Sequence, residues 1–146
     1  IFTYPNADFG SKIIVDEINK FVNQQKNAYI FYSLGQKRYL SLLKSCDIVI
    51  GNSSSGIIEA PIFKKPVVNI GDRQKGRLRS DNIIDCGYSS EQIEAAINKV
   101  LNDEDFKKRL EGIENIYGNG TTSENIVKIL KNICLNSRIL KKKLMY

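Results

Sequence analysis

The stretch DIVIGNSSSGIIEAP, residues 47–61, joins an apolar run to a helical pattern through a turn of small residues. The run over 47–51 is typical of a parallel strand that is covered on both faces. Pro61 cannot donate a hydrogen bond to the carbonyl of Ile57, so we expect the helix to be short or kinked. A buried strand that leads directly into a helix indicates an α/β fold.

Short apolar runs alternate with helical patterns on both sides of this stretch. Residues 10–25, for example, carry apolar side chains along one face of a helix, whereas the charged segment 103–111 is expected to be a turn. The other expected elements are strands at 1–5, 28–33, 66–70 and 82–85, and helices at 36–46, at 89–102 with a serine N-cap, and from about Ser123. We expect one α/β domain over residues 1–146, with a mainly parallel sheet and helices on both faces.

The composition, 42% hydrophobic and 26% charged, is that of an ordinary globular domain. No apolar run approaches the roughly 20 residues that a bilayer-spanning helix needs, so we expect no membrane segment. Residues 1–10 lack the basic and apolar regions of a signal peptide and resemble a strand inside a longer chain. The widely spaced Cys46, Cys86 and Cys134 show no metal-ligand spacing, which favours free thiols in a reducing cytoplasm.

The net charge of +6 is concentrated at one end of the chain. Residues 125–146 contain Lys and Arg but no Asp or Glu, whereas basic and acidic residues are equal in number over 1–124. A basic footprint over the whole domain is therefore absent, and we expect no nucleic-acid partner. The basic end is interpreted as a solvated helix end or tail, with binding to nucleic acid or another anionic surface as the alternative.

The turn GNSSSG, residues 51–56, is the first candidate site, because parallel sheets bind ligands beyond the carboxyl ends of their strands. Small residues let backbone N–H groups approach a ligand, a helix N-terminus favours an anion, and Ser53 and Ser54 add hydroxyl donors. This chemistry suits a phosphate or diphosphate; the alternative is a serine N-cap with turn residues around it. Glu59 either accepts hydrogen bonds from a ribose diol or favours the helix dipole as an early acidic residue.

Two further loops follow strands of the same expected sheet. GDRQKGR, residues 71–77, places Arg73 and Arg77 beside the serine turn, where guanidinium groups can pair with phosphate oxygens. Taken alone, such a basic loop is usually a solvated surface. In PNADFGSK, residues 5–12, Asn6 is a candidate ligand contact, and a helix N-terminus explains the same residues equally well.

The sequence contains no His, which excludes His-based proton transfer, a Ser-His-Asp triad and His metal sites. It also lacks the P-loop pattern and a GxGxxG after its first strand. The residues alone therefore predict a domain that binds a nucleotide diphosphate and has no evident proton-transfer centre.

Three blocks, YPNAD, GNSSSGIIEAP and VVNIGDRQKGR, resemble the UDP-N-acetylglucosamine 2-epimerases in order and spacing over residues 1–102. The PNAD form is similar to the hydrolysing subgroup, which converts UDP-N-acetylglucosamine to N-acetylmannosamine plus UDP by elimination and hydration. The resemblance implies the C-terminal half of a GT-B-like fold of two Rossmann-like domains, with segment 123–146 crossing back to the N-terminal domain. Because that domain would carry the catalytic carboxylates and a His, no catalytic residue is expected here, and the chain alone is expected to be inactive.

The resemblance also implies a UDP site in this chain. Ser53 and Ser54 would hold the diphosphate, and Arg73 would face its oxygens. Glu59 would bind the ribose hydroxyls, and Asn6 would line the cleft. The remaining residues of the implied site are Leu34, near the uracil, and Ser55, Gly56 and Arg77.

No cofactor and no metal is implied. The expected partners are UDP or a UDP-sugar, the N-terminal domain and, as is frequent in the family, a second copy in a homodimer. The implied pathway is the synthesis of sialic or nonulosonic acids or cell-surface polysaccharide. The alternatives are a non-hydrolysing epimerase that gives UDP-N-acetylmannosamine and a non-catalytic module that binds nucleotide sugars.

Overall fold

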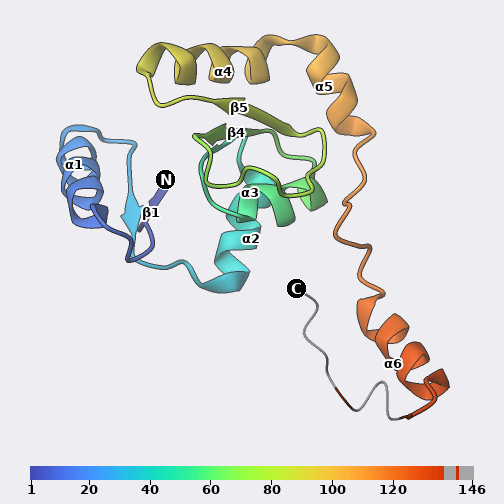
Figure 1. The fold of residues 1–146 in the computed structure, drawn as a ribbon. Helices are drawn as coiled ribbons and strands as arrows, with labels where there is room; N and C mark the ends of the chain where they lie inside the picture. Colours follow the sequence, from blue (N-terminus) through green and yellow to red (C-terminus); the bar gives the residue numbers. More distant parts are fainter. Residues whose placement is uncertain (137–140, 142–146) are drawn as a thin grey trace.

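The computed structural model describes residues 1–136 and Lys141, and these residues alternate between strands and helices (Figure 1). The elements, in chain order, are β1 (Phe2–Thr3), α1 (Ser11–Gln24), β2 (Ile30–Phe31), α2 (Gly35–Ser45), β3 (Val49–Gly51), α3 (Ser55–Ile58), the 3-10 helix η1 (Ala60–Phe63), β4 (Val67–Ile70), β5 (Ile83–Cys86), α4 (Ser90–Asn102), α5 (Glu104–Glu111) and α6 (Thr122–Asn132). This is the α/β class expected from the sequence.

All strand pairs in the described residues are parallel, as expected, but they form two sheets. β1 pairs with β2, and the second sheet has the order β3-β4-β5. Val67 of β4 lies opposite Val49 on one side and Ile83 on the other, so β4 is the central strand. The carboxyl ends of β3 and β4 therefore open toward the same edge, where the serine turn and the loop over 71–81 follow them.

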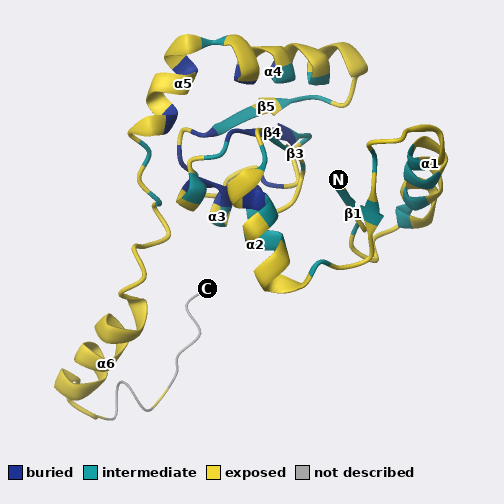
Figure 2. Ribbon diagram, turned by 180° about the vertical axis from the view of Figure 1, so that it is seen from behind, coloured by how far each residue is buried: buried dark blue, intermediate teal, exposed yellow. Residues whose placement is uncertain are grey.

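Helices cover both faces of the β3-β4-β5 sheet (Figure 2). Consecutive residues of a strand point to opposite faces, so neighbouring residues of β4 pack against different helices. Val68 packs on one face against a cluster from α4 and α5, which includes Val100 and Phe106. Val67 packs on the other face against Leu43 of α2 and Ala60 of η1. The core of the chain lies in these two layers, which hold β4 and the loops that follow it in place.

The segment 103–111, which the sequence analysis assigned to a turn, is instead largely the helix α5. The Asp103 side chain caps this helix by accepting a hydrogen bond from the Phe106 backbone N–H at 3.0 Å. Phe106 and Leu110 are one helical turn apart and are both buried, which docks α5 beside α4. The prediction was wrong because the many charges lie on the solvent side and conceal this apolar pair.

Two other expectations about local structure are confirmed. α3 ends at Ile58 after a single turn and passes into η1, which contains Pro61. Ser89 is the N-cap of α4, and its hydroxyl accepts a hydrogen bond from the Gln92 N–H. Short side-chain patterns were sufficient to predict both features because each depends on neighbouring residues.

α6 projects away from the two sheets, and none of its side chains is buried (Figure 1). It begins one residue before the predicted start at Ser123. Part of the predicted terminal segment, including residues 137–140 and 142–146, lies outside the described residues. Across the part of the chain that the structure describes, every helix is too short or too polar to cross a bilayer.

Candidate functional site

A cleft of about 380 Å³ lies where β1, α1 and β3 meet the loop after β4. Its lining includes Asn6 from the loop after β1, Ser53 from the serine turn and Arg73 from the loop over 71–81. Three candidate residues from three separate segments thus share one cavity. The apolar part of the wall includes Ile14, Ile18 and Ile50.

Arg73 spans this cleft by pairing with Asp8, with 3.3 Å between Arg73 Nη2 and Asp8 Oδ2. Both side chains are well exposed to solvent, so the pair is weak and readily exchanged. A doubly charged phosphate group would compete with the single carboxylate for the planar guanidinium. The ion pair therefore holds Arg73 toward the cleft and leaves it able to bind an anion.

The serine turn uses some of the donors that the sequence analysis had assigned to a ligand. The Ser55 N–H donates to Ser53 Oγ at 3.3 Å, and the Gly56 N–H donates to the Ser53 carbonyl at 3.2 Å. α3 is only one turn long, so it has little dipole to attract an anion. The exposed Ser53 hydroxyl and the half-buried Ser54 hydroxyl can still donate to an anion. Among the described residues, the lining of the cleft includes Ser53 and does not include Ser54.

Ser55 is held by Tyr39 of α2, because the hydroxyl groups of the two side chains share a hydrogen bond. Burial raises the pKa of Tyr39, the bond to Ser55 opposes that change, and the negative charge of Glu59 adds to the rise. The charge of Glu59 thus affects the pKa of Tyr39, which lies in α2 five positions after Leu34, the residue before that helix. Ser55 therefore connects the turn to α2, a link that the sequence analysis missed.

Glu59 and Leu34 are both half-buried and lie at helix ends. Glu59 sits between α3 and η1, and Leu34 is the N-cap position of α2. Among the described residues, the lining of the cleft includes neither of them. The structure thus places the expected ribose and uracil contacts beside α2, apart from the cavity that holds Asn6, Ser53 and Arg73.

Gly56 is buried, and its missing side chain has a packing reason. A Cβ atom built at Gly56 would lie 2.8 Å from Cγ1 of Val67, which is itself 3% exposed. Together with its engaged N–H, this makes Gly56 a residue that lets α3 approach β4 closely, and its direct contact with a ligand is not supported. Arg77 is exposed and, within the described part of the chain, is not among the residues that line the cleft.

Gln74 is a buried polar residue that the sequence analysis did not single out. Its side chain is 3% exposed, and its Nε2 donates to the carbonyl oxygen of Asn52 at 2.7 Å. It therefore links the loop that carries Arg73 to the turn that carries Ser53. In the sequence, Gln74 is marked only by its place after Arg73 in GDRQKGR. Its contact with Asn52 spans 22 positions, and a contact over that distance leaves no local pattern.

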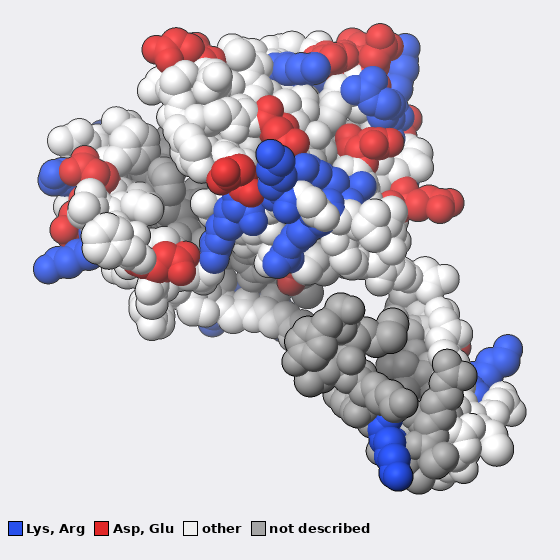
Figure 3. Space-filling view, viewed as in Figure 1, with Lys and Arg blue, Asp and Glu red and all other residues white. Residues whose placement is uncertain are grey.

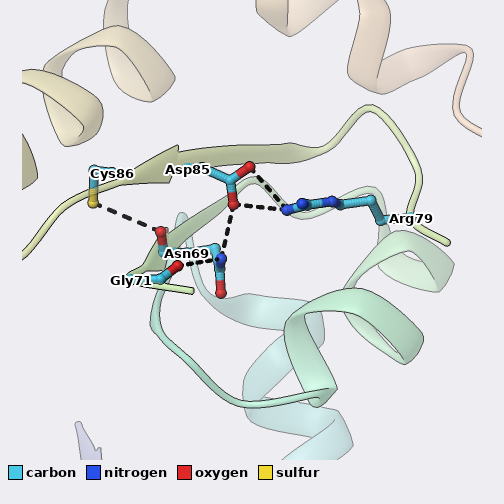
Figure 4. A network of polar contacts seen from close by, with 5 residues as sticks. All are labelled: Asn69, Gly71, Arg79, Asp85 and Cys86. Atoms are coloured by element: carbon cyan, nitrogen blue, oxygen red, sulfur yellow. Dashed lines mark hydrogen bonds and ion pairs between the residues drawn. The ribbon is translucent and has the colours of Figure 1, made fainter. Parts of the chain in front are cut away.

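A network of polar contacts fixes the ends of the loop over 71–81 (Figure 4). Asn69, which is almost completely buried, donates to Asp85 at 2.8 Å, and Arg79 Nη1 lies 2.6 and 2.9 Å from the two Asp85 carboxylate oxygens. Cys86 donates weakly to the Asn69 carbonyl. The network ties the loop back to β4 and β5, which limits the positions that its basic side chains can take.

Basic side chains gather on the face of the molecule over this loop, with acidic side chains beside them (Figure 3). The loop itself supplies Arg73, Lys75, Arg77 and Arg79. Of these, Arg73 and Arg79 are paired with Asp8 and Asp85. The positive potential of this face is thus partly neutralised, and an anion would be attracted mainly to the loop.

Comparison with known proteins places this geometry in a family. The sequence model described as UDP-N-acetylglucosamine 2-epimerase matches residues 1–131 of this chain. The chain belongs to the UDP-N-acetylglucosamine 2-epimerase family. The resemblance of the three sequence blocks is thereby confirmed.

Individual members of the family are clearly related to this chain. It is 38% identical over 138 residues to the UDP-N,N'-diacetylbacillosamine 2-epimerase (hydrolyzing) of Legionella pneumophila. The matched region covers 94% of this chain and 35% of that protein. It is 43% identical over 141 residues to the GDP/UDP-N,N'-diacetylbacillosamine 2-epimerase (hydrolyzing) of Campylobacter jejuni, again 94% of this chain and 35% of the relative. This epimerase-family chain thus spans about a third of the length of those curated relatives.

A crystal structure of a UDP-N-acetylglucosamine 2-epimerase has the same fold. It superposes with a TM-score of 0.65 at 20% sequence identity, over 88% of this chain and 33% of that one. At this identity the likeness concerns the fold alone. The α/β architecture of this epimerase-family chain is therefore that of one part of a GT-B-like enzyme.

Proposed function

We propose that this chain is the UDP-binding half of a hydrolysing UDP-sugar 2-epimerase. The observation that carries the proposal is the cleft in which Asn6, Ser53 and Arg73 converge from three loops at strand ends. Hydroxyl and guanidinium donors in a cavity at this edge of a parallel sheet suit a diphosphate. The hydrolysing relatives named above add support, because they are similar to almost the whole chain.

In the proposed reaction, this half stabilises the leaving group. Elimination of UDP from the sugar leaves an additional negative charge on the diphosphate, and water then adds to the unsaturated sugar. Arg73 and the hydroxyls of Ser53 and Ser54 donate to the diphosphate oxygens as this charge develops. Donors already held in place by the fold need little reorganisation at that moment, which lowers the barrier to elimination.

The proton-transfer groups belong, in this proposal, to an N-terminal domain. The chain contains no His, and it spans about a third of its curated relatives' length. A cleft between the two domains would bring the acid and base groups of one to the UDP held by the other. We therefore expect the 146-residue chain to bind UDP and to release none from a UDP-sugar by itself.

The sugar has two candidates. The resemblance of the sequence blocks points to UDP-N-acetylglucosamine, whereas the two hydrolysing relatives are named for UDP-N,N'-diacetylbacillosamine. A further relative of 39% identity over 132 residues is the polysialic acid biosynthesis protein P7 of Escherichia coli, which supports a role in polysialic acid biosynthesis. The two sugars can be distinguished by fusing this chain to the N-terminal part of a relative and following the turnover of each UDP-sugar by NMR. A product that remains linked to UDP would indicate the non-hydrolysing alternative.

Binding is tested by following the amide spectrum of the ¹⁵N-labelled chain during addition of UDP, UMP and uridine. We expect perturbed signals from the serine turn and the loop over 71–81, and tighter binding of UDP than of uridine. Arg73→Ala should weaken UDP binding. The matched change Arg109→Ala removes an exposed guanidinium that lies over the Phe106 ring on α5, and it should leave UDP binding unchanged. Unperturbed signals at millimolar UDP, or equal effects of the two substitutions, would contradict the proposal.

A further inference from the structure

Gln74 is placed between the two parts of the candidate anion site. It directly follows Arg73 in the sequence, and it donates to the carbonyl of Asn52, which directly precedes Ser53. A single side chain therefore connects the residue next to Arg73 with the residue next to Ser53, which are two of the three proposed diphosphate ligands. The acceptor is a backbone oxygen, so the bond fixes the position of the chain itself and does not depend on the side chain of Asn52.

The rest of the loop is anchored elsewhere. Its beginning is held by the Gly71 N–H, which donates to the Cys86 carbonyl, and its end by Arg79 on Asp85 and by Ser80, which donates to the Glu114 carbonyl. Between these anchors, the Tyr88 hydroxyl donates to Asp72 and the Tyr117 hydroxyl donates to the Leu78 carbonyl, and Arg73 pairs with Asp8. None of these partners belongs to the serine turn. In the described structure, Gln74 is thus the contact that ties the middle of the loop to the serine turn.

Only part of the hydrogen-bonding capacity of the buried Gln74 side chain is used. Its Oε1 is buried and has no hydrogen-bond partner among the described residues, while its Nε2 is bonded. A buried acceptor without a partner destabilises the folded state, whereas an apolar side chain of similar shape would avoid that loss. The unpartnered Oε1 thus offsets stability that the Nε2 bond contributes, and a role in positioning gives the glutamine a further reason.

We propose that Gln74 is a positioning residue that sets the spacing between Arg73 and Ser53, so that both can contact the same diphosphate. This inference rests on the proposed function, because it needs the diphosphate to bind there. It assigns to Gln74 an effect on the diphosphate and none on the nucleoside, because Glu59 and Leu34 lie outside the cleft. It also predicts that the effect operates through Arg73.

The test replaces Gln74 by Met, which has a similar length and neither donates nor leaves an oxygen buried. We expect the affinity for UDP to fall about tenfold, the affinity for uridine to stay within about twofold, and the unfolding temperature to be unchanged or higher. Gln24→Met, at the exposed end of α1, is the matched control and should change none of these quantities. Gln74→Leu repeats the test if the Met variant does not fold.

A double-mutant cycle separates positioning from general damage. In the Arg73→Ala background, Gln74→Met should have little further effect on UDP affinity, because the group that it positions is gone. An additive effect, or an equal loss of UDP and uridine affinity, would overturn the inference while leaving the proposed function intact. A wild-type chain that binds no UDP would overturn the proposed function, and this inference with it.

Discussion

Gly56 provides a test in which two physical effects have opposite signs. Replacing Gly by Ala inside a helix normally stabilises a protein by up to about 1 kcal/mol. Gly56 is a buried residue of α3, so this gain is expected if only the helix matters. The structure predicts the opposite, because the new methyl group would lie 2.8 Å from Cγ1 of Val67.

Val67 has little freedom to move away. It is 3% exposed, belongs to the central strand β4 and packs against Leu43 and Ala60. Its branched side chain is stiff, so relief requires a shift of α3 or of the strand. Overpacking of this kind costs about 1–3 kcal/mol, and subtracting a helix gain of up to about 1 kcal/mol from the middle of that range leaves a net destabilisation of about 1–2 kcal/mol.

The assay is thermal unfolding followed by circular dichroism, together with urea unfolding for the free energy. For a chain of this size, the expected decrease in the unfolding temperature of Gly56→Ala is about 3–6 °C. Gly112→Ala is the matched control, because a Cβ atom there would meet only the Arg109 carbonyl at 3.8 Å. A Gly56→Ala chain as stable as wild type would refute the packing argument, and so would an equal loss in the Val67→Ala background.

Three further predictions concern separate parts of the chain. Glu59→Gln should reduce the preference for UDP over deoxy-UDP in calorimetric titration; equal loss for both would make Glu59 only a helix-end charge. Cys134 is exposed, whereas burial raises the pKa of the Cys46 thiol, so alkylation at neutral pH should label Cys134 first by mass spectrometry. The hydrogen bond from the Phe106 N–H lowers the pKa of Asp103, so the stability from this cap is present at neutral pH and is lost as the pH falls below about 4. Asp103→Asn should flatten that part of the curve of unfolding temperature against pH, and an unchanged slope would contradict the assignment.

Much of the fold could be predicted because its signals are local. The continuous apolar run of β3, the serine cap of α4 and the proline that limits α3 each depend on residues within a few positions of one another. The charged helix α5 was missed because two apolar residues within many charges are a weak local signal. Its two apolar residues pack in a cluster that includes Val68 of β4, which no short window of sequence around α5 contains.

The candidate site divides in the same way. Ser53, Arg73 and Asn6 could be named in advance because each follows a predicted strand. The ends of β3 and β4 meet at one edge of their sheet, whereas only the structure shows that the end of β1, in the other sheet, lines the same cleft. Ser55 and Gly56 belong to the same motif, but the structure engages the first with Tyr39 and packs the second on Val67. A motif lists residues together, and it does not say which of them face a ligand.

The sequence by itself determined the order of the strands and of the helices other than α5, the position of the small-residue turn and, through three motif blocks, membership of the UDP-N-acetylglucosamine 2-epimerase family. These properties follow from backbone preferences and side-chain spacing over short distances along the chain. Only the tertiary structure decided that Gln74 ties two loops together, that Asp8 pairs with Arg73 and that α5 is a helix. The two loop contacts, and the packing of Phe106 in a cluster with Val68, join segments far apart in the sequence. Their energies arise only when the folded core brings the partners within a few ångströms of each other.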